Sequence, residues 1–330
     1  MKEVKNLQLR GKSILSPMMA EFVAQKRAMG FKFNAAVESL NLFDRFCVDE
    51  DVKEPILTAV LIEKWSDRKR GESISTHVYR VRCVRGFLRF MHNNGFTAPT
   101  TFHPLTMRGS NFVPYIFTED ETRKLLMAVD ENSPACSVSP FRHLVMPVLF
   151  RMLCCCGLRV SEALQLKVND VDLSKGVLII ANAKGGKERL VAMSGSLTAI
   201  CRAYRDEMLS RGCEHEYFFP APDGGLYDGS TIYDNFRKYL HAAGIPHRGR
   251  GKGPRLHDLR HTFAVNVLNR WVLEGKDLYT CLPILSTYLG HVSLTSTEEY
   301  LRLVPEAYGD LTSSFEHKFE TMFPEVADEN

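Results

Sequence analysis

One segment near residue 100 limits what this chain can fold into. The stretch FTAPTTFHPLTMRGSNFVPYIF contains Pro99, Pro104, Gly109 and Pro114, a density that prevents a continuous helix or a central strand. On both sides of it, apolar residues return to regular spacing. We therefore expect an interdomain linker over 97–116 and two separately folded domains, in keeping with a length of 330 residues.

The first domain, residues 1–96, has helical periodicity. We predict helices near 15–29, 36–48, 57–69 and 75–94, which together make a helical bundle. Two stripes follow different faces of the last helix. One is apolar (Val81, Val84, Leu88 and Met91) and the other is basic (Arg82, Arg85 and Arg89).

The basic stripe is open to two interpretations. It is either a solvated face or a helix laid along a nucleic-acid backbone. Four cations on the preceding helix favour the second: Lys64, Arg68, Lys69 and Arg70.

Charge is unevenly distributed along the chain. Residues 1–96 carry 17 basic and 11 acidic side chains, whereas residues 306–330 carry 1 basic and 7 acidic side chains. The small net charge of the whole chain, +3, therefore combines an acidic tail with a basic body. A basic body fits a polyanionic partner, either nucleic acid or an anionic membrane surface. The tail has an apolar stripe at helical spacing and is expected to form an amphipathic helix that packs on its own domain or on another copy (Phe315, Phe319, Met322 and Phe323).

No apolar stretch approaches the length of a membrane span, and the N-terminal residues lack the apolar region of a signal peptide. The nine cysteines include no C-x-x-C pair, which indicates buried thiols in a reducing compartment. We expect a cytoplasmic protein without a membrane partner.

The second domain, residues 117–305, combines helices with a small sheet. It opens on a capping box at Thr118–Glu121. Strands are predicted at 177–180 and 189–193, on either side of a Gly-Gly hairpin. Helices are predicted at 119–130, 140–155, from Ser161, and at 195–210, 229–243, 257–273 and 281–289. The expected fold class is mainly α, with a small antiparallel sheet in the second domain.

Four short clusters in this domain carry reactive side chains: GLRVSE (157–162), KGGK (184–187), HDLRH (257–261) and LGH (289–291), the last followed nine residues later by a tyrosine. Each alone is also typical of a surface ion pair or an exposed hairpin. The hairpin lacks the GK[ST] ending of a phosphate-binding P-loop. His257 and His261 have the i, i+4 spacing of a zinc site, but Arg260 between them disfavours a cation, so we expect no metal.

Taken together, the clusters suit an anionic reaction centre. A phosphodiester gathers negative charge in its five-coordinate transition state, and arginine forks hold that charge. Tyrosine can act as the nucleophile, provided that a base or a strongly positive site activates the phenol and that an acid protonates the leaving alkoxide.

The order GLRVSE, KGGKER, HDLRH, LGH and Y resembles the tyrosine recombinase, or phage integrase, family over most of 118–305. Residues 1–96 resemble its SAM-like core-binding domain in helical architecture and basic character only. The resemblance implies a site-specific recombinase that cleaves and rejoins double-stranded DNA at specific sites through a 3′-phosphotyrosyl intermediate, for a mobile element, without metal, ATP or other cofactor. It also implies a homo-tetramer whose C-terminal helix docks in a neighbouring subunit.

The resemblance implies roles for five residues of the centre. Arg159 and Arg260 clamp the scissile phosphate, and Tyr300 is the nucleophile. His257 accepts the tyrosyl proton or hydrogen-bonds the phosphate, and His291 is a second phosphate-binding imidazole.

The remaining residues that match the family are implied to assist these five. Lys184 is implied as the general acid, with Lys187 as its nearby rival or a DNA contact, while Glu162 and His261 are expected to position their neighbours. The loop HRGRGKGPR adds DNA-binding candidates: Arg248, Arg250 and Lys252. The segment 261–290 is longer than in compact members of the family.

Two other functions share these features. A type IB topoisomerase uses the same tyrosine chemistry to relax DNA, and a DNA-binding protein on the same fold could have no catalytic activity. The LGH motif and the apolar stripe of the tail argue against the first, and the retention of every reactive residue type argues against the second.

Overall fold

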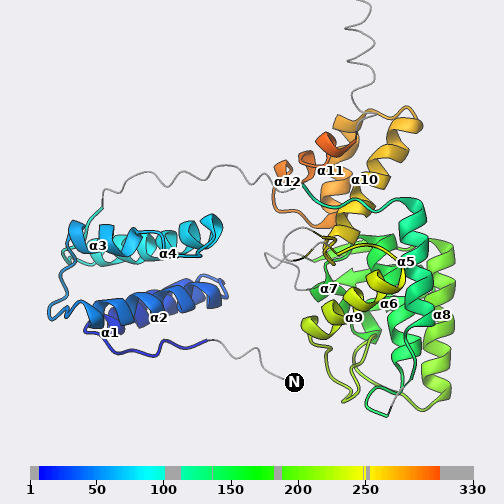
Figure 1. Cartoon of the computed structure of the whole chain (residues 1–330), viewed down its shortest axis with the longest axis horizontal. Helices are drawn as coiled ribbons and strands as arrows, with labels where there is room; N and C mark the ends of the chain where they lie inside the picture. The colour runs from blue at the N-terminus through cyan, green and yellow to red at the C-terminus, as the bar shows by residue number, and fades with distance from the viewer. Residues whose placement is uncertain are drawn as a thin grey trace, which may run out of the picture. The chain divides into compact units, whose positions relative to one another are not determined.

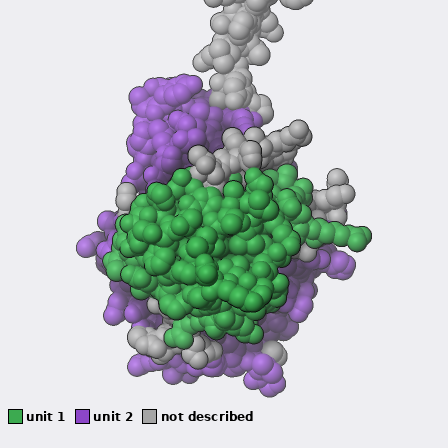
Figure 2. Space-filling model, turned by 90° about the vertical axis from the view of Figure 1, so that its left-hand side faces the viewer, with its two compact units in different colours: residues 1–112 green, residues 113–330 purple. Residues whose placement is uncertain are grey.

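The computed structural model describes residues 7–100, 113–135, 137–181, 188–247, 249 and 253–304. The chain divides into two compact units, residues 1–112 and 113–330, which Figure 2 colours separately. Each unit has its own buried apolar core. The predicted fold class, mainly helical with a small antiparallel sheet, is confirmed.

The first unit packs its helices around aromatic rings. They are α1 (Ser16–Ala28), α2 (Asn34–Asp49), α3 (Ala59–Ser66) and α4 (Ile74–Asn93), near the predicted ranges (Figure 1). The third helix is shorter than predicted and ends at Ser66, so Arg68, Lys69 and Arg70 follow it instead of lying on it. The rings of Phe43 and Trp65 lie 5.1 Å apart, and those of Phe22 and Phe87 lie 5.9 Å apart. Large aromatic side chains of this kind dominate the burial energy of a small core.

One arginine of α4 is buried instead of exposed. Arg80 donates from Nε to Glu72 at 2.8 Å and from its terminal nitrogens to the carbonyls of Trp65 and Asp67 at 2.6 and 2.9 Å. Its guanidinium also lies 4.5 Å from the centre of the Trp65 ring. Arg80 therefore fixes the turn that connects α3 to α4.

The main core of the second unit is surrounded by helices and one face of the sheet. The helices are α5 (Glu119–Glu131), α6 (Arg142–Cys156), the short α7 (Val160–Leu164), α8 (Gly195–Ser210) and α9 (Gly229–Ala242). The capping box is present: Thr118 Oγ1 accepts from the Glu121 amide at 3.1 Å, and the Thr118 amide donates to the Glu121 carboxylate at 2.9 Å.

The sheet has one strand more than predicted. Strands β2 (Val177–Ile180) and β3 (Arg189–Ala192) form the expected antiparallel pair, and β1 (Val171–Asp172) pairs with the other edge of β2. In the register, Leu178 lies opposite both Val171 and Val191.

Three further helices lie together at one end of this unit in Figure 1. They are α10 (Asp258–Leu273), α11 (Leu278–Leu289) and α12 (Thr295–Glu298). They enclose a second core with Leu268, Leu285 and Tyr300. Two 3₁₀ turns (Val168–Asp170 and Leu301–Leu303) and α12 were not predicted. No helix in the described ranges has the length and apolar composition needed to cross a bilayer.

Candidate active site

The ends of two helices hold the first predicted arginine. Arg260, at the start of α10, is 1% exposed and donates to the carbonyl of Gly157 at 2.8 Å and to that of Leu289 at 2.7 Å. These carbonyls lie at the C-termini of α6 and α11, where the helix dipole favours a cation. Burial and the charge of Arg159 lower the pKa of Arg260 to about 10, so it stays cationic near neutral pH.

Both helices end at a glycine in the left-handed conformation, Gly157 with φ +59° and Gly290 with φ +69°. A side chain at Gly157 would place its Cβ 2.4 Å from the ring of Phe263, and one at Gly290 would place it 2.9 Å from the Arg189 guanidinium. Gly157 therefore makes room for the ring of Phe263, and Gly290 allows Arg189 to approach the end of α11 closely.

The second predicted arginine lies beside the first. Arg159 caps α7 and donates to the carbonyl of Gly290 at 3.2 Å and to Glu162 at 2.7 Å. Glu162 also accepts from the Arg159 backbone amide at 2.9 Å and lies 3.9 Å from Arg260. Glu162 thus lies between the two guanidinium groups.

A third arginine, Arg189 on β3, was not among the predicted site residues. It donates to both oxygens of Glu162, at 3.0 and 2.8 Å, and from Nε to the carbonyl of Tyr288 at 2.8 Å. The only signal in the sequence is its spacing from an apolar residue: Arg189 precedes Val191 by two residues, so the two share a face of the strand. The structure shows that this face is the inward one, because Val191 is buried.

The carboxylate of Glu162 is ionised across the whole neutral and mildly acidic range. Its side chain is 5% exposed, which by itself would raise its pKa. The hydrogen bonds from Arg189 and Arg159 outweigh that burial and lower the pKa of Glu162 to about 2.

The predicted nucleophile lies in the same cluster. Tyr300 is 4% exposed, and its hydroxyl lies 3.1 Å from Nδ1 of His261. Burial raises the pKa of Tyr300, and the positive charges of Arg260 and Arg159 oppose that rise. The hydroxyl of Tyr300 thus meets His261. The resemblance implied instead that His257 accepts the tyrosyl proton or hydrogen-bonds the phosphate.

The two other predicted histidines flank this pair. The ring of His257 lies 4.8 Å from that of His261, and the ring of His291 lies 6.1 Å from that of Tyr300. Nδ1 of His291 is 2.8 Å from the hydroxyl of the fully buried Thr297. Burial, and after it the neighbouring cationic groups, lower the pKa of both His257 and His291 to about 4, so both rings are neutral at pH 7.

The charges of this cluster leave it strongly positive. Three guanidinium groups around one carboxylate give a net charge of +2 (Arg159, Arg189, Arg260 and Glu162). The side chain of Arg260 also acts on Tyr300, because its charge and hydrogen bonding oppose the rise in the pKa of the phenol. A cluster with this net charge favours an anion that accepts hydrogen bonds from its arginines.

The predicted hairpin and loop cations (Lys184, Lys187, Arg248, Arg250 and Lys252) lie outside the described residues, as does the apolar stripe of the tail. Within the described ranges, no group of three histidine, cysteine or acidic side chains is arranged to hold a metal ion.

The basic stripe of α4 faces away from its core. Arg82 and Arg89 are exposed and Arg85 is half-buried, whereas the apolar stripe is buried. Two other cations of the first unit are engaged locally: Lys64 pairs with Glu50 at 2.7 Å, and Arg68 donates to the carbonyl of Glu72. The α4 stripe is therefore the better candidate surface for a polyanion.

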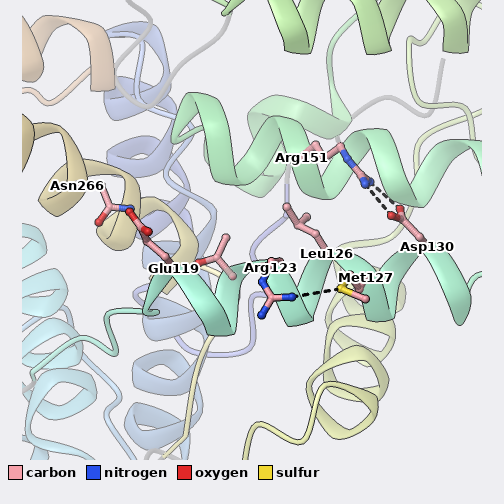
Figure 3. Close-up of a pocket in the computed structure, with 8 residues that line it drawn as sticks. Glu119, Arg123, Leu126, Met127, Asp130, Arg151 and Asn266 are labelled. Atoms are coloured by element: carbon pink, nitrogen blue, oxygen red, sulfur yellow. Dashed lines mark hydrogen bonds and ion pairs between the residues drawn. The ribbon is translucent and has the colours of Figure 1, made fainter.

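A separate groove of about 430 Å³ is lined mainly by α5, together with Arg151 of α6 and Asn266 of α10 (Figure 3). Arg151 donates to both oxygens of Asp130 at 2.6 Å across it. None of the predicted site residues lines this groove, so it is not part of the arginine cluster.

Comparisons with known proteins agree with this geometry. Residues 116–306 match the phage integrase family. A putative integrase/recombinase of Sinorhizobium fredii, y4rB, is 33% identical over 310 residues, which cover 91% of this chain and 96% of that protein. Tyrosine recombinase XerD of Pseudomonas aeruginosa is 30% identical over 234 residues, covering 69% of this chain and 71% of that protein.

A solved structure shares the fold. The XerH site-specific recombinase bound to its palindromic difH substrate superimposes with a TM-score of 0.64 at 19% identity, covering 86% of this chain and 79% of that one.

Proposed function

The chain belongs to the phage integrase family, and on this premise we propose that it is a site-specific tyrosine recombinase that cuts and rejoins double-stranded DNA. The observation that carries the proposal is the cluster of net charge +2, whose Arg260 and Arg159 act electrostatically on the Tyr300 phenol. Attack of a phenolate on a phosphodiester passes through a phosphorane with two negative charges, which such a cluster neutralises.

In this mechanism, Tyr300 attacks the scissile phosphorus and forms a 3′-phosphotyrosyl bond as the 5′ oxygen departs. Arg159 and Arg260 hold the non-bridging oxygens, and their hydrogen bonds to helix-end carbonyls orient them in advance. His257 and His291 are neutral and donate hydrogen bonds to the same phosphate.

The leaving 5′ oxygen needs a proton. We assign this role to Lys184, with Lys187 as the alternative donor. The free 5′ hydroxyl of a partner strand then attacks the phosphotyrosyl bond, which conserves the bond energy without ATP or a metal ion.

Strand exchange of this kind requires two DNA sites, and we propose a homo-tetramer in which the tail bearing Phe315 and Phe319 docks in a neighbouring subunit. The proposed setting is the cytoplasm, at the nucleoid. The biological role would be integration, excision or transposition of a mobile element. The basic stripe of α4 and the loop cations would bind the DNA backbone.

Covalent trapping in cells tests this function. Lysis under denaturing conditions should recover the protein attached to DNA, and sequencing that DNA should reveal a recurrent site. A nicked suicide duplex of the recovered site should then give a covalent adduct with the wild-type chain and none with Tyr300→Phe.

Three outcomes would contradict the proposal. The absence of any adduct would indicate a DNA-binding protein without catalytic activity, and an adduct with Tyr300→Phe would indicate another nucleophile. Relaxation of supercoiled plasmids that lack the site would indicate a topoisomerase.

A further inference from the structure

The histidine that meets the nucleophile is not the one that the sequence motif favours. His257 and His261 lie one turn apart at the start of α10. Nδ1 of His261 is 3.1 Å from the Tyr300 hydroxyl, within reach for proton transfer, and the centres of the two rings are 5.5 Å apart. His257 is the more exposed of the two and has no hydrogen bond to Tyr300 among the described contacts.

A buried carboxylate favours the tautomer that a base requires. Oδ1 of Asp258 lies 4.0 Å from Nε2 of His261, which is too long for a hydrogen bond but close enough to attract a proton to that nitrogen. Asp258 is 1% exposed and is held by the backbone amide of Arg255 at 2.7 Å and by its guanidinium at 3.1 Å. With the proton on Nε2, the lone pair of Nδ1 points at the tyrosyl oxygen.

The protonation state of His261 also suits this role. Burial lowers its pKa, and the nearby Arg255 and Arg260 lower it further, whereas Asp258 and Glu299 raise it. The ring is therefore neutral near pH 7 and able to accept a proton. The two carboxylates would stabilise the imidazolium that results.

We propose that His261 is the general base of the cleavage step, an inference that rests on the proposed recombinase function. As the Tyr300 oxygen bonds to phosphorus, its proton moves to Nδ1 of His261. The bond between phosphorus and the 5′ oxygen breaks, and that oxygen takes a proton from a separate acid. In rejoining, the imidazolium returns its proton to the departing phenolate.

The test uses suicide duplexes of the trapped site with two leaving groups, the natural 5′ oxygen and a 5′ bridging sulfur. Sulfur leaves without protonation, so it removes the need for the acid and leaves the need for the base. We expect His261→Gln to slow single-turnover cleavage by about 100-fold or more with both duplexes. Lys184→Ala should be slow with oxygen only, and His241→Gln, which changes an exposed histidine on α9, should cleave like the wild type.

A second measurement separates a base from a merely structural histidine. Replacing Tyr300 with a fluorotyrosine makes the phenol more acidic and reduces its need for a base. We expect this change to increase the cleavage rate of His261→Gln by at least about 10-fold, because lowering the pKa of the phenol by one unit lowers the free energy of its ionisation by about 1.4 kcal/mol. Unfolding temperatures would confirm that the variants are folded.

Each contrary result is distinct. Wild-type cleavage by His261→Gln, a defect that the sulfur leaving group cures, or a defect that fluorotyrosine leaves unchanged would each overturn the assignment of the base. Absence of an adduct with the wild-type chain on either duplex would instead overturn the recombinase function itself, and the base assignment with it.

Discussion

The Glu162 carboxylate makes a quantitative prediction about stability. Its pKa falls from 4.5 to about 2 on folding because the hydrogen bonds from Arg189 and Arg159 outweigh the effect of burial. A tenfold change in proton affinity is worth about 1.4 kcal/mol, so the charged form contributes roughly 3 kcal/mol to the free energy of unfolding. Glu162→Gln keeps the shape and removes the charge, and should lower that free energy by about this amount at pH 7.

The sign of the pH dependence follows from the lowered pKa. The contribution is complete above pH 4.5 and is lost as the pH falls from 4.5 to about 2, where the wild-type carboxyl becomes protonated. The difference between wild type and Glu162→Gln should therefore be largest at neutral pH and approach zero near pH 2.

Urea unfolding from pH 7 to pH 2 would measure this difference. A Trp65→Phe background leaves Trp271 as the fluorophore, so that the signal reports the second unit. Glu216→Gln is the matched control, since Glu216 pairs with Lys167 in an exposed position. It should change stability much less. A difference for Glu162→Gln that stays constant between pH 4.5 and 2 would refute the reasoning.

Three other perturbations test separate parts of the structure. Gly290→Ala should lower the free energy of unfolding by roughly 2–4 kcal/mol in a denaturation experiment, because its Cβ would lie 2.9 Å from Arg189 in addition to the strain of the left-handed backbone. Gly275→Ala is the control, since Gly275 has a similar φ of +67° but no atom near its Cβ, and it should cost about 1 kcal/mol. Equal losses at the two positions would exclude the clash with Arg189. In a Trp271→Phe background, where Trp65 is the fluorophore, Arg80→Met should destabilise the first unit by roughly 3–5 kcal/mol, since it leaves the Glu72 carboxylate buried without its partner. A loss below about 1 kcal/mol would contradict this. Replacing all three arginines of the basic α4 stripe with alanine should weaken DNA binding and reduce the slope of log affinity against log salt concentration by roughly 2–3 (Arg82, Arg85 and Arg89). An unchanged slope would show that the stripe is an ordinary solvated face.

Much of the fold was predictable because it depends on local signals. Apolar spacing located the helices of the first unit, and the hydroxyl and carboxylate of Thr118 and Glu121 marked the start of α5. The missed elements are too short to show a period: β1 has two residues and α12 has four.

The site was less predictable than the fold, because its contacts join residues that are far apart in the sequence. Residue types and motif order nominated Arg159, Arg260 and Tyr300, which the fold brings together. The contact between His261 and Tyr300 spans 39 residues and depends on how α10 packs against the chain after α12, which no local spacing encodes. Arg189 was missed for a related reason, because next to a Gly-Gly hairpin a cation resembles ordinary surface charge until the inward face of β3 is known.

All the residues of the arginine cluster and its histidines come from one stretch, 157–300, inside the second unit. Among the described residues, none of the hydrogen bonds within this cluster involves the helices before residue 113. Under the proposed function, the first unit can therefore change without disturbing these contacts. Grafting residues 1–112 of a relative onto this chain should leave the arginine cluster intact and, under the same proposal, change the DNA that the chain binds.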